Sequence, residues 1–237
     1  MLESPAALEV AVMTLNGSVS TALLAACRAA DLPAIGVSGV DAGLVRAAQR
    51  PPQIREVDGE RQSVTFGLVG DIVAIDSSVV TRLLDAGLMP IVSPLAADDG
   101  GQVLNINADT VAATLACELG AEKLIFLTDT PGLLEDKHNP ASLVSLTDIV
   151  GVEARRARGA IDGGMMPKIK AAIDALLGGV KRVHLVGYQH ESSLLYEIFT
   201  NEGSGTLIVE SAADLLPAEH TAHTGHSESS VQVQAIS

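Results

Sequence analysis

Along most of this chain, short apolar segments of strand length alternate with longer segments of helical period. Such alternation predicts an α/β fold, a mostly parallel open sheet sandwiched by helices. The expected strands cover residues 35–39, 90–93, 102–106, 124–127, 183–186 and 206–209. The expected helices cover residues 5–15, 18–30, 76–87, 108–120, 148–158, 167–177 and 192–199. Asn16-Gly17 is expected to end the first of these helices.

Residues 44–76 interrupt this alternation with consecutive β-type segments. Pro51-Pro52 and Asp58-Gly59 are typical turn pairs between them, so a β-hairpin insertion is predicted here. From Ser211 onward the apolar pattern stops, and Ser, Thr, His and Glu dominate. This composition predicts a disordered tail over residues 211–237.

The formal net charge of −14 excludes the usual nucleic-acid-binding classes, which need basic patches. The sequence shows no long uninterrupted apolar run of the kind that crosses a membrane, and its start lacks the basic region of a signal peptide. Cys27 and Cys117 lie within apolar helical patterns. We therefore expect both to be reduced core residues of a cytoplasmic protein.

Asn105, Asn107 and Asp109 occupy every second position where a strand pattern gives way to a helix pattern. Side chains two apart on a strand share one face, so the three are expected near one point at the strand's carboxyl end. Open α/β sheets bind ligands at that edge. The alternative is that these residues cap the following helix. Capping needs one residue, so a site is favoured for Asn105 and Asp109, whereas Asn107 fits both interpretations.

The segment Thr128-Asp129-Thr130-Pro131-Gly132-Leu133 follows a strongly apolar strand. Backbone N–H groups of such a turn can hold phosphate, and Asp129 can face a ribose or a metal-bound water. A plain β-turn built on Pro-Gly is the alternative.

In Gly163-Gly164-Met165-Met166-Pro167-Lys168, the glycines allow close approach of a ligand, and Pro167 suits the first turn of a helix. Lys168 then lies near a helix N-terminus, where the macrodipole disfavours a cation. A nearby anion explains this position better than a solvated surface lysine does.

Two further segments carry weaker signals. The turn Val37–Gly43 either lines a substrate pocket or is purely structural. His220, His223 and His226 have a spacing that could grip a metal, but so polar a tail favours a solvated segment. The sequence has no GxxxxGK[ST] loop and no GxSxG elbow.

Taken together, these segments resemble the acetylglutamate kinase family of the amino-acid kinase fold. The resemblance runs from about residue 8 to 209 and keeps the order and spacing of several short motifs. The matching segments are Asn105–Thr110, Gly120–Leu134, Ile161–Lys168, Gly178–His184 and Phe199–Thr206, with a looser match at Gly36–Asp41.

The resemblance implies transfer of the γ-phosphoryl group of ATP to the γ-carboxylate of N-acetyl-L-glutamate, an early step of arginine biosynthesis. It implies that Asn105 binds the acetylglutamate, that Asp109 organises the catalytic lysines and that Lys168 stabilises the transferring phosphoryl group. Mg²⁺ would be carried by the nucleotide, with no separate metal site. The residues implied to hold ATP are Thr128, Asp129, Thr130, Pro131, Gly132, Leu133, Ala160, Ile161, Asp162, Gly163 and Gly164.

The family also implies an arrangement of lobes and subunits. An amino-acid-substrate lobe is expected over residues 1–107 and a nucleotide-binding lobe over residues 108–210. A homodimer or a higher homo-oligomer is expected, with neither nucleic acid nor membrane as a partner.

The sequence departs from the family at its start. The family's K-x-G-G loop, H-G-G-G-P loop and R-x-T segment have no counterpart in this sequence, in which the first lysine is Lys123. We therefore expect a truncated N-terminal lobe, weak ATP binding and little or no kinase activity. The alternatives are an impaired paralogue or split-enzyme fragment that acts as a nucleotide- or amino-acid-binding regulatory protein, and a kinase for another carboxylate such as aspartate or carrier-bound aminoadipate.

Overall fold

A computed structural model of the chain describes residues 4–57, 60–136, 138–139, 141–161, 163–189, 191–200 and 203–215. The chain divides into two compact units, Met1–Leu119 and Gly120–Ser237. This division falls later than the lobe boundary expected after residue 107. The reason is that the helix after Asn107 packs Val111, Leu115 and Leu119 against the core of the first unit.

The first unit begins with one continuous helix made of α1 (Pro5–Val12), the π-helical segment η1 (Met13–Val19) and α2 (Ser20–Ala29). The expected break at Asn16-Gly17 is therefore wrong. Asn16 accepts a hydrogen bond from the hydroxyl of Ser93 (2.5 Å), and the wider π-helical turn carries the chain through this point.

This helix, Pro5–Ala29, is long and apolar enough to cross a membrane by length and composition, contrary to the expectation that the chain has no such segment. A single helix of this kind near the N-terminus is weak evidence for a membrane protein. One side of the helix approaches β1 closely. A Cβ added at Gly36 would lie 2.5 Å from the Ser20 hydroxyl, so glycine permits this approach.

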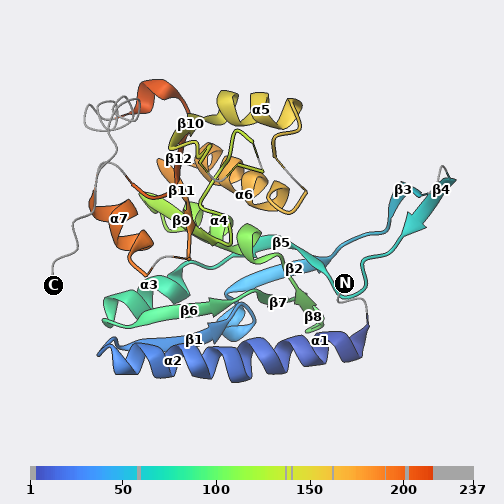
Figure 1. The fold of residues 1–237 in the computed structure, drawn as a ribbon. Coiled ribbons are helices and arrows are strands. Elements are labelled where there is room, and N and C mark those ends of the chain that lie inside the picture. The colour runs from blue at the N-terminus through green and yellow to red at the C-terminus, as the bar shows by residue number, and fades with distance from the viewer. Residues whose placement is uncertain are drawn as a thin grey trace. The chain divides into compact units, whose positions relative to one another are not determined.

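The strands of the first unit form three small sheets, shown in Figure 1. In the first, β1 (Ala34–Ser38) pairs in parallel with β6 (Met89–Ser93). The second has the order β5-β2-β7-β8, with bounds Gly70–Ile75, Val45–Gln49, Leu95–Ala97 and Val103–Asn105. The predicted hairpin is confirmed as the antiparallel pair β3 (Gln53–Val57) and β4 (Glu60–Val64).

Helices α3 (Ser78–Asp85) and α4 (Ala108–Glu118) complete the first unit. Its core is aliphatic. The buried members include Leu44, Val80, Leu104, Ile106 and Val111.

The second unit contains one sheet of order β10-β12-β11-β9. Strands β9 and β11 are parallel, β10 and β12 are parallel, and β11 and β12 are antiparallel. Their bounds are Lys123–Thr128 for β9, Leu146–Asp148 for β10, Arg182–Gly187 for β11 and Thr206–Val209 for β12. The helices are α5 (Ile149–Ala157), α6 (Met166–Leu177) and α7 (Ser193–Phe199).

The α/β class is confirmed, with parallel strands and helices in both units. The expected tail is only partly described: Ala212–Asp214 form a 3₁₀ turn capped by Ser211. Its three histidines lie outside the described residues.

We predict that Leu104→Ala lowers the free energy of unfolding by about 2–5 kcal/mol, because Leu104 is fully buried and its removal leaves a cavity. Leu84→Ala is the matched control, since Leu84 is half exposed and should change stability by less than about 0.5 kcal/mol. Urea denaturation of both variants measures the difference. Equal effects would contradict the core described above.

Candidate functional site

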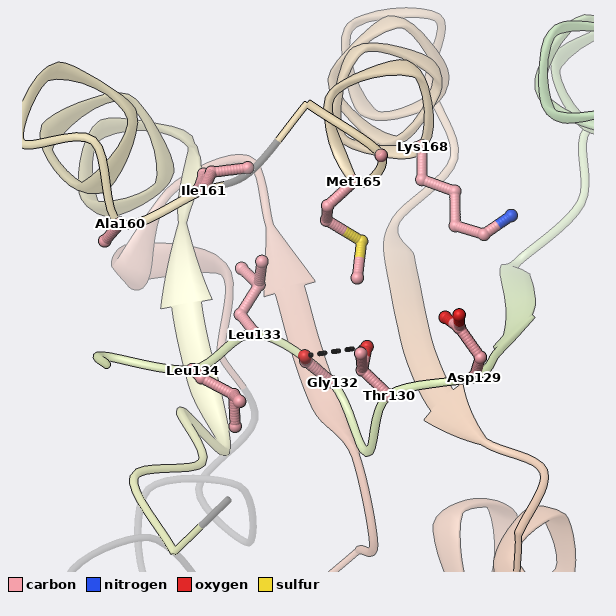
Figure 2. Close-up of a pocket in the computed structure, with 10 residues that line it drawn as sticks. Asp129, Thr130, Gly132, Leu133, Leu134, Ala160, Ile161, Met165 and Lys168 are labelled. Carbon is pink, nitrogen blue, oxygen red and sulfur yellow. Dashed lines mark hydrogen bonds between the residues drawn. The ribbon is translucent and has the colours of Figure 1, made fainter. Parts of the chain in front are cut away.

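A tight turn follows β9 at the carboxyl end of this strand. Thr128 is buried, and its hydroxyl donates to the carbonyl oxygens of Thr130 and Val186. The Thr130 hydroxyl in turn donates to the carbonyl oxygen of Gly132 (3.4 Å), as drawn in Figure 2. These bonds fold the chain back on itself directly after the strand.

A hydrogen bond connects the turn to β12. The backbone N–H of Leu133 donates to the hydroxyl of Thr206 at 2.8 Å, and Thr206 is fully buried. A Cβ on Gly132 would lie 2.5 Å from the same hydroxyl. Gly132 is therefore required for this close contact between the turn and β12.

A second segment, between α5 and α6, faces this turn across a cavity of about 210 Å³. Figure 2 shows Ala160, Ile161 and Met165 on the side opposite the turn. The lining residues are Asp129, Thr130, Gly132, Leu133, Leu134, Ala160, Ile161, Gly164, Met165 and Lys168.

The structure thus brings together most of the residues proposed for nucleotide binding. Thr128 lies beneath the turn rather than in the cavity, and Pro131 packs toward Gly187, where an added Cβ would lie 2.9 Å from the proline Cα. Gly163 does not line the cavity. Asp162 lies outside the described residues.

Leu134 and Met165 also line the cavity and were not among the residues predicted to bind the nucleotide. Met165 directly follows Gly164 and lies three residues before Lys168. Its place within this segment was the one signal that could have predicted its position in the cavity. Thr206 was missed for a different reason. Its role depends on a contact with Leu133, far away in the sequence.

Lys168 occupies the first turn of α6, directly after Pro167. Its Nζ lies 5.6 Å from the centre of the Phe126 ring, on the strand that leads into the turn. Figure 2 shows Lys168 and Asp129 on the same side of the pocket. The first N–H groups of a helix lack partners within the helix, so cation and helix N-terminus together favour an anion here.

The other predicted site residues belong to the first unit. Asn107 caps α4, because its side-chain oxygen accepts a hydrogen bond from the N–H of Thr110 (3.0 Å). The capping interpretation is therefore the correct one for Asn107. Asn105 ends β8, and Asp109 lies in the first turn of α4.

The turn after β1 is built by its own hydrogen bonds. The backbone N–H of Ser38 donates to the carboxylate of Asp41 at 2.7 Å. An added Cβ at Gly39 would lie 2.0 Å from the carbonyl oxygen of Leu95. These contacts favour the structural interpretation of this turn.

Within the described residues, no three His, Cys, Asp or Glu side chains gather in a way that could hold a metal ion.

Comparison with known proteins agrees with this geometry. Residues 2–187 match the amino acid kinase family. The chain is 49% identical to the acetylglutamate kinase of Myxococcus xanthus over 208 residues, which cover 87% of this chain and 68% of that protein. It is 43% identical to the acetylglutamate kinase of Symbiobacterium thermophilum over 205 residues, which cover 86% of this chain and 69% of that protein.

Among solved structures, the chain is similar to the N-acetylglutamate synthase of Neisseria gonorrhoeae, solved with coenzyme A and N-acetyl-glutamate. The TM-score is 0.71 at 28% identity, and the match covers 88% of this chain and 45% of that one.

We predict that Gly132→Ala lowers the free energy of unfolding by about 1–3 kcal/mol, because its methyl group would overlap the Thr206 hydroxyl. Gly163→Ala is the control, since an added Cβ there meets nothing within 4 Å. Thermal unfolding of both variants makes the comparison. A Gly132→Ala protein as stable as the control would show that β12 does not hold the turn.

Proposed function

We propose that this chain, which belongs to the amino acid kinase family and within it to the acetylglutamate kinases, is itself a kinase. In the proposed reaction, it transfers the γ-phosphoryl group of ATP to the γ-carboxylate of N-acetyl-L-glutamate. The observation that carries the proposal is the cavity of the second unit, which a lysine at a helix N-terminus and a tight turn line together. The 49% identity to an acetylglutamate kinase supports the choice of acceptor and a place in arginine biosynthesis.

Lys168 has the central role in this proposal. Phosphoryl transfer spreads negative charge over the oxygens of the transferring group, and catalysis depends on cations and N–H donors fixed around it. The backbone of Lys168 is held in the first turn of α6, and its amino group lies over the face of the Phe126 ring, a cation–π contact. It is therefore held ready for an incoming phosphate rather than ordered by it.

The remaining walls suit the rest of the nucleotide. Leu133, Ile161 and Met165 present apolar surface to a flat base. Asp129 can accept hydrogen bonds from a ribose hydroxyl or from water on the Mg²⁺ that ATP carries. Thr130, Gly132, Ala160 and Gly164 complete this wall, and Thr128, Pro131, Asp162 and Gly163 remain proposed contacts or supports of the nucleotide.

The acceptor is assigned to the first unit. The amide of Asn105 can donate to a carboxylate and accept from an acetamido N–H, which is the pairing N-acetyl-L-glutamate needs. Asp109, in the first turn of α4, keeps the role that the family resemblance implies, which is to organise the catalytic lysines. Family membership also supports a cytoplasmic homodimer or higher homo-oligomer.

We predict that Lys168→Ala lowers kcat by about a hundred-fold or more, because it removes a preorganised donor to the transition state. Lys170→Ala is the matched control, since Lys170 lies on the same helix, is exposed and pairs with Asp174. A coupled assay of ADP release with MgATP and N-acetyl-L-glutamate measures both. Equal rates for the two variants would remove Lys168 from the mechanism.

We also predict that ADP release depends on N-acetyl-L-glutamate and does not occur with aspartate as the acceptor. Acetylation removes the amino charge of the acceptor, so a site that binds the acetamido group leaves a free ammonium without a partner. The same assay with each carboxylate in turn provides the measurement. MgATP binding without ADP release from any acceptor would favour a nucleotide-binding regulatory protein instead.

A further inference from the structure

A buried pair of titratable side chains, His184 and Glu197, lies beneath the sheet of the second unit and outside the proposed reaction. His184 is on β11 and Glu197 on α7, and Nδ1 of the histidine lies 2.7 Å from Oε1 of the glutamate. Their side chains are only 7% and 4% exposed. Neither residue lines the candidate pocket.

Glu197 also holds a backbone segment with its second carboxylate oxygen. Oε2 accepts hydrogen bonds from the N–H groups of Ser204 (2.7 Å) and Gly205 (2.8 Å). Burial acts to raise the pKa of Glu197, but the bonds from His184 and from the Ser204 backbone outweigh it and leave the pKa below its ordinary value. The side chain is therefore an ionised carboxylate at neutral pH.

The pair is more than packing requires. Nε2 of His184 is buried and has no hydrogen-bond partner among the described residues, which is costly for a polar atom. Two apolar side chains of similar volume would remove that cost, but they would leave the N–H groups of Ser204 and Gly205 without their acceptor. The carboxylate is therefore retained for the two N–H groups that it holds in place.

The segment that Glu197 holds leads directly to the pocket. Gly205 packs so tightly on β11 that an added Cβ would lie 2.1 Å from the carbonyl oxygen of Leu185. The next residue, Thr206, accepts the hydrogen bond from Leu133 in the pocket-lining turn. One chain of contacts thus runs from Glu197 through Gly205 and Thr206 to Leu133.

We propose that Glu197, oriented by His184, is a positioning residue that sets the nucleotide-binding turn by fixing Gly205 and Thr206. This inference rests on the proposed function, in that the pocket must bind ATP. It assigns to Glu197 an effect on nucleotide affinity without any contact with the nucleotide.

Calorimetric titration of the whole protein with MgATP tests the proposal. Glu197→Ala should weaken binding by about ten-fold, because the N–H groups of Ser204 and Gly205 lose their acceptor and no longer fix the segment that leads to the turn. Glu197→Gln should stay within about three-fold of the original protein, because its amide oxygen still accepts both N–H groups, although more weakly. Thr206→Val should weaken binding, and adding it to Glu197→Ala should cause no further loss, since both changes break one chain of contacts.

Leu176→Ala is the control for a general loss of stability. Leu176 is buried at the far end of α6, so its truncation should destabilise the fold and leave MgATP affinity unchanged. Unchanged MgATP affinity in Glu197→Ala, or additive effects in the double variant, would overturn the positioning role of Glu197. The proposed function of the pocket would still stand. If the original protein does not bind MgATP, the proposed function falls and this inference with it. If Glu197→Ala does not fold, Thr206→Val decides, and unchanged affinity in that variant also overturns the proposal.

Discussion

The hydrogen bond between the Leu133 amide and the Thr206 hydroxyl joins two distant parts of the chain, and the candidate pocket depends on it. On one side of this bond, the turn after β9 places Asp129 and Thr130 at the cavity. On the other side, β12 lies between β10 and β11 in the sheet. The bond fixes the polar turn to the most deeply buried strand, so the pocket gains its rigidity from the core.

The periodicity of apolar residues predicted most of the regular structure, because burial of one face is the strongest constraint on each element. Strands β7 (Leu95–Ala97) and β10 (Leu146–Asp148) were not predicted, since they are too short to show a period. The continuous N-terminal helix was missed because Asn-Gly is usually a stop signal. Here the bond between Asn16 and Ser93, a tertiary contact, overrides that local preference.

Part of the candidate pocket was also predictable from the sequence. The turn at Asp129–Leu133 and the approach to Lys168 were both found, because glycine, proline and a lysine at a helix start are local signals. Asn107 shows the limit of this reasoning. Its spacing fits a ligand site and a helix cap equally, and only the bond to Thr110 decides for the cap. The contacts of Thr206 and Glu197 could not be assigned from the sequence, since only the fold brings their partners Leu133 and Gly205 to them.

The strand order of the second unit also has a consequence for synthesis on the ribosome. Strand β12 is the last of the described strands in chain order, yet it lies between two strands that precede it, β10 and β11. Until Thr206–Val209 leave the ribosome, these two strands have no shared neighbour and the turn at Leu133 lacks its acceptor. The described sheet is therefore completed only when Thr206–Val209 have been synthesised, and until then the facing edges of β10 and β11 are open.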